Sequence, residues 1–249
     1  MSIERGTGIA ENLRSFDAST ASDGAVAALA ATIYHAALTE ASTLLRSPIT
    51  APLGQLVQAR ATLAELLSTC LAARIGHPGG EAALLRELFS ARLSNCDATR
   101  SMVADVAKAF TSDPAVCSIL QPILLFKGFL ALTAHRVAHS LWLEGSDTSA
   151  FTALLLQSRV SEAFGVDIHP GATIGHGVML DHASAVVIGE TAVVGDDVRH
   201  LDPRARSAHH HQAAKRLSMP RLLQQTRPCA RHLVAPSPPR VRRSTCFTG

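Results

Sequence analysis

A six-residue repeat through residues 167–198 constrains the fold more than any other feature of this sequence. Five consecutive blocks align at this period, and apolar residues fill their second positions and continue the series: Ile168, Ile174, Leu180, Val186, Ala192 and Val198. Glycines at positions 171, 175, 177, 189 and 195 fall near the turns, where a residue without a Cβ accepts a positive φ at little cost. The period is typical of a hexapeptide β-helix, in which each short strand points one side chain into a continuous core. A β-meander with glycine turns is the alternative.

Residues 24–164 have a different pattern, rich in Ala and Leu, and predict a helical domain after an N-terminal extension at 1–23. Turn-forming residues divide this domain into several helices. These breaks are Ser47-Pro48, His77-Pro78-Gly79-Gly80, Asp113-Pro114 and Gly145. The most regular apolar stripe repeats at intervals of four, three and four residues, which places it on one helical face. It consists of Leu130, Ala134, Val137 and Leu141.

His135 and His139 lie four residues apart, so both side chains fall on one face of a predicted helix. That spacing can hold a metal ion, but the segment lacks the Glu that follows the first His in the zinc-protease pattern. The sequence offers no third ligand. We therefore interpret both residues as structural histidines and expect no metal site.

The charge of the chain changes sign after Val198. The formal net charge is +3, yet residues 1–198 carry 12 Lys and Arg against 19 Asp and Glu, whereas residues 199–249 carry 11 against Asp202 alone. The second segment also holds 6 of the 12 prolines and has no six-residue period. Such a segment cannot bury enough apolar surface to offset its chain entropy, so we expect a disordered basic tail at 199–249. The chain as a whole, at 47% hydrophobic, can still form a sizeable core.

Cysteine usage and the N-terminus favour a cytoplasmic protein. The five cysteines are odd in number and form no CxxC pair, which argues against a disulfide framework and a zinc finger. The first 40 residues hold five acids against two Arg, unlike a signal or transit peptide. The most apolar stretch, 119–143, is interrupted by Lys127, His135 and Arg136, so we expect no membrane span.

A set of longer motifs occurs in a fixed order along the chain. They are Ser47-Pro48-Ile49, Asp113-Pro114-Ala115, Phe126-Lys127-Gly128-Phe129, Ala131-Leu132, His135-Arg136-Val137, Val166-Asp167-Ile168-His169-Pro170, Met179-Leu180-Asp181-His182-Ala183 and Val187-Ile188-Gly189-Glu190-Thr191-Ala192-Val193. In order and spacing they resemble the serine acetyltransferase family over about residues 24–198. The two blocks around Asp167 and His182 are highly specific for it.

The resemblance implies an all-α domain at 24–164 followed by a left-handed parallel β-helix that starts at 165–198, so the fold class is α plus β-solenoid. It implies assembly as trimers that pair into hexamers. The implied reaction transfers an acetyl group from acetyl-CoA to the hydroxyl of L-serine, giving O-acetylserine and CoA for cysteine synthesis. Acetyl-CoA is then a co-substrate, and no permanently bound cofactor, metal, membrane or nucleic acid is expected.

His182 is the candidate general base, because a serine hydroxyl is a poor nucleophile at neutral pH and an imidazole titrates in the useful range. The family pattern implies that Asp167 orients this imidazole, since the two are separated by nearly one coil of three six-residue faces. It also implies that Asp181 and Asp113 hold the ammonium group of the substrate through charge-assisted hydrogen bonds. The residue types alone also fit plain turn residues and a surface histidine.

The chain departs from the family after Val198. Family members continue with more coils, a Gly-Gly-Thr-Gly-Lys loop and an Arg-His-Pro element; those coils form much of the acetyl-CoA groove, so the cofactor-binding residues stay unknown here. Arg199-His200 resembles the Arg-His-Pro element but comes too early to take its role. The Ile-ending tail that docks O-acetylserine sulfhydrylase is missing, which puts that partner in doubt. We expect a weakly active or inactive chain that misassembles, and we interpret 199–249 as the product of a frameshift, a retained intron or a gene-model error.

Three other functions stay open. The basic tail could make the protein a binding module for nucleic acid or an anionic surface, although it holds only one aromatic residue, Phe247. The chain could also be another hexapeptide O- or N-acyltransferase with a different acceptor. Finally, it could be a catalytically dead subunit that assembles with an intact copy through its helical domain.

Overall fold

A computed structural model of the chain describes residues 7–77 and 80–201. The first part of these residues forms helices, which we call the helical region: α1 (Thr7–Ser15), α2 (Asp23–Leu44), α3 (Ala51–Gln58), α4 (Leu63–Ile75), α5 (Glu81–Leu93), α6 (Cys96–Ser112), α7 (Leu120–Leu125), α8 (Lys127–Leu143) and α9 (Asp147–Phe164). Short strands follow, which we call the coil region: β1 (Val166–Ile168), β2 (Thr173–Ile174), β3 (Met179–Asp181), β4 (Val186–Ile188), β5 (Val193–Val194) and β6 (Arg199–Leu201). Apart from β6, the segment expected to form the basic tail lies outside the described residues.

Each of the four predicted breaks separates two helices, and α1 adds a helix ahead of residue 24. Further breaks, which the sequence analysis did not mark, separate α3 from α4, α5 from α6 and α7 from α8. Polar residues start several of them: Ser22, Thr62, Asn95 and Ser146 precede α2, α4, α6 and α9, and each side-chain oxygen accepts a hydrogen bond from a first-turn amide. Such caps satisfy amides that have no partner inside the helix. Among the helices of the described residues, none is long and apolar enough to span a membrane.

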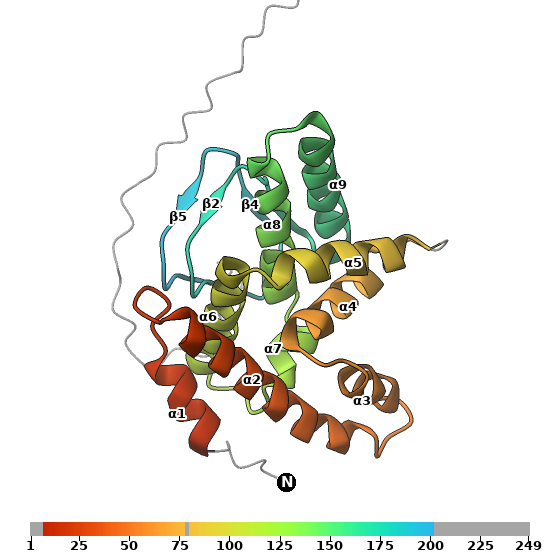
Figure 1. Ribbon diagram of the computed structural model, residues 1–249, viewed down its shortest axis with the longest axis vertical. Coiled ribbons are helices and arrows are strands. Elements are labelled where there is room, and N and C mark those ends of the chain that lie inside the picture. The colour runs from red at the N-terminus through yellow and green to blue at the C-terminus, as the bar shows by residue number, and fades with distance from the viewer. Residues whose placement is uncertain (1–6, 78–79, 202–249) are drawn as a thin grey trace, which may run out of the picture. The chain divides into compact units, whose positions relative to one another are not determined.

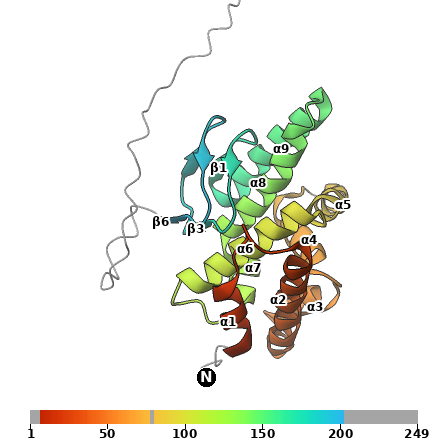
Figure 2. The same cartoon turned by 60° about the vertical axis from the view of Figure 1, so that its left-hand side comes forward.

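Helix α8 lies between the coil region and α9, and it also packs on α5 and α6 (Figures 1 and 2). Its predicted apolar stripe is confirmed, because all four members are buried: Leu130, Ala134, Val137 and Leu141. Leu132 and Ala131 are fully buried as well, outside that stripe. A helix covered on several sides buries residues all round rather than on one face. The position of α8 therefore explains why its sequence is apolar beyond the predicted stripe.

The strands of the coil region pair in three parallel sheets of two strands each, β1 with β4, β2 with β5 and β3 with β6. Each strand thus lies on the strand three places earlier, as stacking of a three-faced coil requires. β6 pairs with β3 through Met179 and Arg199, which carries the coil region beyond the boundary expected at Val198. Parallel pairing uses backbone groups, so it continues after the six-residue pattern of side chains has ended.

One turn of the coil takes 20 residues, as the pairs Val166 with Val186 and Thr173 with Val193 show. Three six-residue faces would give 18, so the prediction of a strict period was wrong at one corner. The extra residues lie between β3 and β4, where His182, Ala183 and Ala185 all have positive φ, at 56°, 44° and 54°. Residues with a Cβ rarely adopt this conformation, and it costs about 1 kcal/mol or more for each. The corner that carries His182 is therefore the most strained backbone among the described strands and turns.

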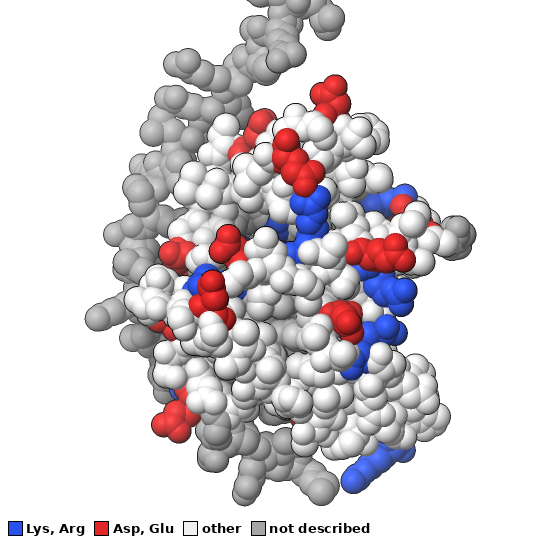
Figure 3. All heavy atoms as spheres, viewed as in Figure 1, with Lys and Arg blue, Asp and Glu red and all other residues white. Residues whose placement is uncertain are grey.

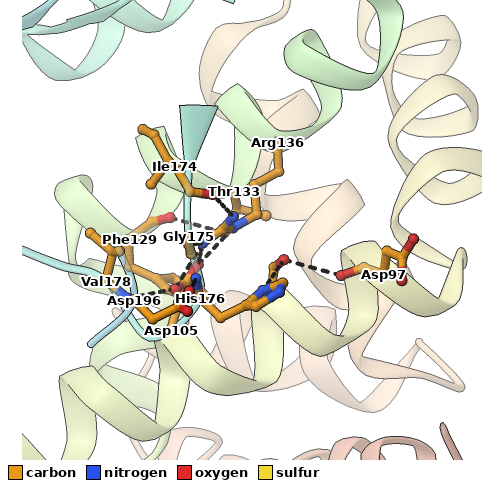
Figure 4. A network of polar contacts seen from close by, with 11 residues as sticks. Asp97, Asp105, Phe129, Thr133, Arg136, Ile174, Gly175, His176, Val178 and Asp196 are labelled. Atoms are coloured by element: carbon orange, nitrogen blue, oxygen red, sulfur yellow. Dashed lines mark hydrogen bonds and ion pairs between the residues drawn. The ribbon is translucent and has the colours of Figure 1, made fainter. Parts of the chain in front are cut away.

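A buried ion pair joins the helical region to the coil region (Figure 4). Arg136 on α8 donates to both carboxylate oxygens of Asp105 on α6, at 2.8 and 3.0 Å, and Nη2 also donates to the carbonyl of Gly175 at 2.8 Å. The amide of Val178 donates to Asp105 Oδ1 at 2.8 Å. Burial raises the pKa of Asp105 to about 6, against the opposing effects of Arg136 and Val178. These bonds satisfy a buried charge with groups from both regions and fix the first coil turn on the helices.

Candidate functional site

His182 lies at the strained corner between β3 and β4, and its side chain is 67% exposed. Its backbone has a φ of 56°, in the left-handed region that residues with a Cβ rarely adopt. Backbone strain of this kind persists where the surrounding structure holds it, and it is common at functional sites. The structure therefore leaves the His182 imidazole accessible at a strained corner, and its role as a general base stays a prediction.

Asp181 lies between His182 and Arg199, a residue to which the sequence analysis gave no role. Its Oδ1 lies 3.7 Å from His182 Nε2, and its Oδ2 accepts a hydrogen bond from Arg199 Nη2 at 2.9 Å. The Asp181 side chain is only 13% exposed. The carboxylate predicted to hold a substrate ammonium group thus already has a cation of the same chain against it.

Arg199 also contacts the end of α6. Its Nη1 donates to the carbonyl oxygen of Ser112 at 2.7 Å, immediately before Asp113. Asp113 itself is half-buried, and its Oδ1 accepts from the amide of Ala115 at 2.9 Å. Asp113 therefore makes the backbone hydrogen bond expected of a turn residue. Arg199 brings this turn and Asp181 into one cluster.

Asp167 lies on β1, and the hydrogen bond that its carboxylate makes joins it to α9. Gln157 on α9 donates from Nε2 to Asp167 Oδ1 at 2.6 Å. The carboxylate that lies near the His182 ring is that of Asp181. Because β1 lies under β4, and His182 lies in the corner that leads into β4, the two residues belong to adjoining coil levels. The orienting role of Asp167 stays a prediction, and Gln157 is a contact that the sequence did not indicate.

The start of α8 packs against the corner between β3 and β4 that carries His182. A Cβ built on Gly128 would lie 2.0 Å from the carbonyl oxygen of Leu180 and 3.0 Å from the Cβ of Ala183, so only glycine fits there. Lys127 Nζ donates to Ser184 Oγ at 3.1 Å. The Lys-Gly pair of the sequence motif thus has a structural explanation, since both residues hold the corner on which His182 lies.

The histidines of α8 make different contacts from those of a metal site. His135 is buried, and burial, followed by the charge of Arg136, lowers its pKa to about 3. His139 Nδ1 is hydrogen-bonded to the carbonyl of Pro170 at 2.7 Å. No group of three or more metal-ligating side chains occurs in the part of the chain that the structure describes. Both residues pack α8 against the first coil turn.

The exposed charges do not form a basic patch on the face drawn in Figure 3, where acidic and basic side chains are interspersed on a mostly uncharged surface. The binding-module alternative depends on residues 199–249, of which the structure describes Arg199–Leu201. That alternative therefore stays a prediction.

Comparison with known proteins identifies relatives of this chain. A family model described as serine acetyltransferase, N-terminal, matches residues 30–134. The rice (Oryza sativa subsp. japonica) protein named probable serine acetyltransferase 4 is 52% identical over 145 residues, which are 57% of this chain and 45% of that protein. The chain spans a little under half the length of such curated rice relatives.

Two solved structures resemble the fold over a longer span. Soybean serine acetyltransferase, complexed with serine, is 36% identical and has a TM-score of 0.65, covering 69% of this chain and 70% of that one. Serine acetyltransferase from Brucella abortus strain S19, in complex with coenzyme A, is 36% identical with a TM-score of 0.63, covering 68% and 67%. A helical domain joined to a parallel three-faced coil is thus shared with bacterial and plant acetyltransferases. This chain belongs to the serine acetyltransferase family, which confirms the resemblance found in its sequence.

Proposed function

We propose that this chain transfers an acetyl group from acetyl-CoA to the hydroxyl of L-serine, giving O-acetyl-L-serine and CoA. The observation that supports this most directly is the exposed His182 at a strained corner beside Asp181, in a chain of this family. The soybean relative is complexed with serine and the Brucella abortus relative with coenzyme A, which agrees with the two substrates. The left-handed sense of the incomplete β-helix, a trimer or hexamer and a cytoplasmic location remain predictions.

In the proposed reaction His182 accepts the proton of the serine hydroxyl while the oxygen attacks the thioester carbonyl. The new C–O bond forms, the C–S bond breaks, and the proton reaches the sulfur of departing CoA through the same imidazole. A positioned base of this kind contributes a rate factor of about 10² to 10⁴. The neutral ring must face the hydroxyl, so its second nitrogen needs a carboxylate to fix the tautomer.

Asp167 is proposed for that orienting role, and Gln157 supports it by holding one carboxylate oxygen at 2.6 Å. With Oδ1 held in this way, Oδ2 of Asp167 is the oxygen that remains for His182. Asp181 and Asp113 are proposed to bind the substrate ammonium. Asp181 is the better placed of the two, since one of its oxygens already lies 3.7 Å from the imidazole.

We also propose that turnover is lower than in complete family members. The six-residue period ends at Val198, and the sequence beyond it has neither the Gly-rich loop nor the later coils that the family uses for acetyl-CoA. We therefore expect a turnover number below the value of about 10 s⁻¹ that is typical of enzymes. An ordinary turnover number would contradict this expectation and leave the reaction itself unaffected.

The direct test incubates the purified 249-residue chain with acetyl-CoA and L-serine, and measures O-acetylserine by mass spectrometry. Mass spectrometry is preferable to a thiol reagent, because Cys96 and Cys117 are exposed and would react with one. We expect product from the natural sequence and a loss of 10² to 10⁴ in kcat for His182→Asn, as estimated for a lost general base. The matched control is His35→Asn, an exposed histidine on α2 outside the site.

Two outcomes separate the parts of the proposal. A folded chain that forms no O-acetylserine contradicts the function. Product formation that is unchanged in His182→Asn contradicts the role of His182 and leaves the function in place.

A further inference from the structure

Arg199 is the residue of the site that the family pattern does not explain. It lies at the start of β6, and its guanidinium bridges two parts of the structure that are 87 and 18 residues away in sequence. Nη2 donates to Asp181 Oδ2 at 2.9 Å, and Nη1 donates to the carbonyl of Ser112 at 2.7 Å. The Arg199 side chain is 33% exposed, so solvent and small molecules can still reach it.

We propose that Arg199 occupies the position of the substrate ammonium at Asp181, and so acts as an internal competitor against amino-acid acceptors. The inference rests on the proposed function, because it takes Asp181 to be an ammonium-binding carboxylate. A guanidinium and an ammonium group seek the same partner, a carboxylate oxygen with a neighbouring backbone carbonyl. Arg199 makes both of these bonds from within the chain.

Both oxygens of Asp181 already face side chains of the same chain. Arg199 uses Oδ2, while Oδ1 faces His182 at 3.7 Å. An incoming ammonium must therefore displace the guanidinium or lie beside it. Two positive charges held at one carboxylate repel each other. Serine loses part of the attraction that would otherwise orient its hydroxyl toward the imidazole.

The other charges around the corner do not reverse this effect. Lys127 lies at the same corner, where its Nζ donates to Ser184 Oγ at 3.1 Å. Asp113 is the second carboxylate of the cluster, but its Oδ1 is already bonded to the amide of Ala115. The site therefore favours hydroxyl compounds without an ammonium group more than a site with a free Asp181 would.

The test compares two acceptors that differ by the ammonium group, L-serine and 3-hydroxypropanoate. Their dissociation constants are measured by calorimetry on the full chain and on Arg199→Gln, which keeps a donor for Ser112 but removes the charge. We expect the ratio of affinities, serine over 3-hydroxypropanoate, to rise about fivefold in Arg199→Gln, the effect of freeing one partly exposed ion pair. The ratio cancels any direct attraction between Arg199 and the carboxylate that both probes carry.

Arg199→Ala serves as a second variant, and the thermal melting of both is measured to establish that they fold. Arg86→Gln, an exposed cation on α5, is the matched control and leaves the ratio unchanged. Adding Asp181→Asn to Arg199→Gln abolishes the rise, because the ammonium then has no carboxylate to gain. An unchanged ratio in a folded Arg199→Gln overturns the inference.

Acetyl transfer is measured on the same proteins to keep the two proposals apart. Transfer to serine with no change in the ratio overturns the role of Arg199 and leaves the proposed function intact. A fivefold rise without any transfer supports the role of Arg199 as a competitor and contradicts the proposed function. Failure of every variant to bind serine overturns both.

Discussion

The helical region and the coil region differ in how they bury apolar side chains. In the helical region large residues from separate helices, such as Ile33, Phe89 and Leu132, are fully buried in one hydrophobic core. The coil region buries its apolar residues mainly in its first turn, whereas in the second turn Val187 and Val193 are 74% and 72% exposed. Burial of apolar area contributes about 25 cal/mol per Å², so the second turn gains little from it. Its stability depends on backbone pairing and on contacts with the first turn.

Polar contacts stabilise the boundary between the two regions. The buried pair of Asp105 and Arg136 holds the first turn, and exposed contacts such as Lys108 with Asp197, at 2.5 Å, reach the second. Buried pairs are costly to break, whereas exposed pairs contribute at most about 1 kcal/mol. The coil region should therefore separate from the helices when the buried pair is lost, well before the helical core itself unfolds.

The largest expected effect comes from Arg136→Met. It leaves the carboxylate of Asp105 fully buried without its cation, and we expect the free energy of unfolding to fall by about 4 kcal/mol. Chemical denaturation measures that loss. Trp142, the single tryptophan of the chain, lies edge-on to His169 with ring centroids 5.1 Å apart, so its fluorescence reports the docking of the coil region.

A double variant tests whether charge or packing causes the loss. Asp105→Leu combined with Arg136→Met removes both charges, and we expect it to recover part of the stability that Arg136→Met loses. If Arg136→Met lowers the free energy of unfolding by less than about 1 kcal/mol, apolar contacts hold the coil region on the helices. The contrast between the two regions then does not hold.

Much of the helical region could be predicted from its sequence, because its signals are local. Proline and glycine breaks located four of the loops between helices, and spacing located the buried stripe of α8. The six-residue period located the strands but missed the 20-residue turn, since positive φ at His182, Ala183 and Ala185 leaves no mark in residue types that normally avoid it.

The candidate site was only partly predictable. His182 and Asp181 come close because they are adjacent in sequence, whereas the bonds of Asp167 to Gln157 and of Asp181 to Arg199 join different elements. No spacing rule predicts such contacts, because they depend on how α9 and β6 lie against the coil. Charged residues inside apolar helices, Asp105 and Arg136, were the signal that could have indicated the buried pair.

A smaller effect is expected from Gly128→Ala, which tests the corner rather than the whole interface. The added methyl would lie 2.0 Å from the Leu180 carbonyl oxygen, which is backbone and cannot rotate away. We expect a loss of about 3 kcal/mol in the free energy of unfolding, the upper range for overpacking. Gly24→Ala on α2 is the control, since its Cβ would have only one neighbour, Ser22 Oγ at 4.0 Å. Equal stability of the two variants would show that α8 and β3 can move apart freely.

The smallest effect, when counted per pH unit, concerns a residue at the boundary between the two regions, His135 on α8. Burial lowers its pKa to about 3, from 6.5, so the folded protein keeps this imidazole neutral while the unfolded chain protonates it. Between pH 6.5 and about 3 the unfolded state binds one more proton, and its relative free energy falls as the pH drops. The stability due to neutral His135 is therefore complete above pH 6.5 and is lost toward pH 3, by up to about 1.4 kcal/mol per pH unit.

His135→Gln should remove that slope, and denaturation curves at successive pH values between 7.5 and about 4 measure it. Asp105 acts in the opposite sense, since its raised pKa makes ionisation costly as the pH rises toward about 6, and it is present in both proteins. The difference between the two curves therefore isolates His135. Above pH 7 the curves should run parallel, which serves as the internal control. Parallel curves at acid pH as well would mean that His135 takes up its proton in the folded state, and that water reaches the boundary between α8 and the first coil turn.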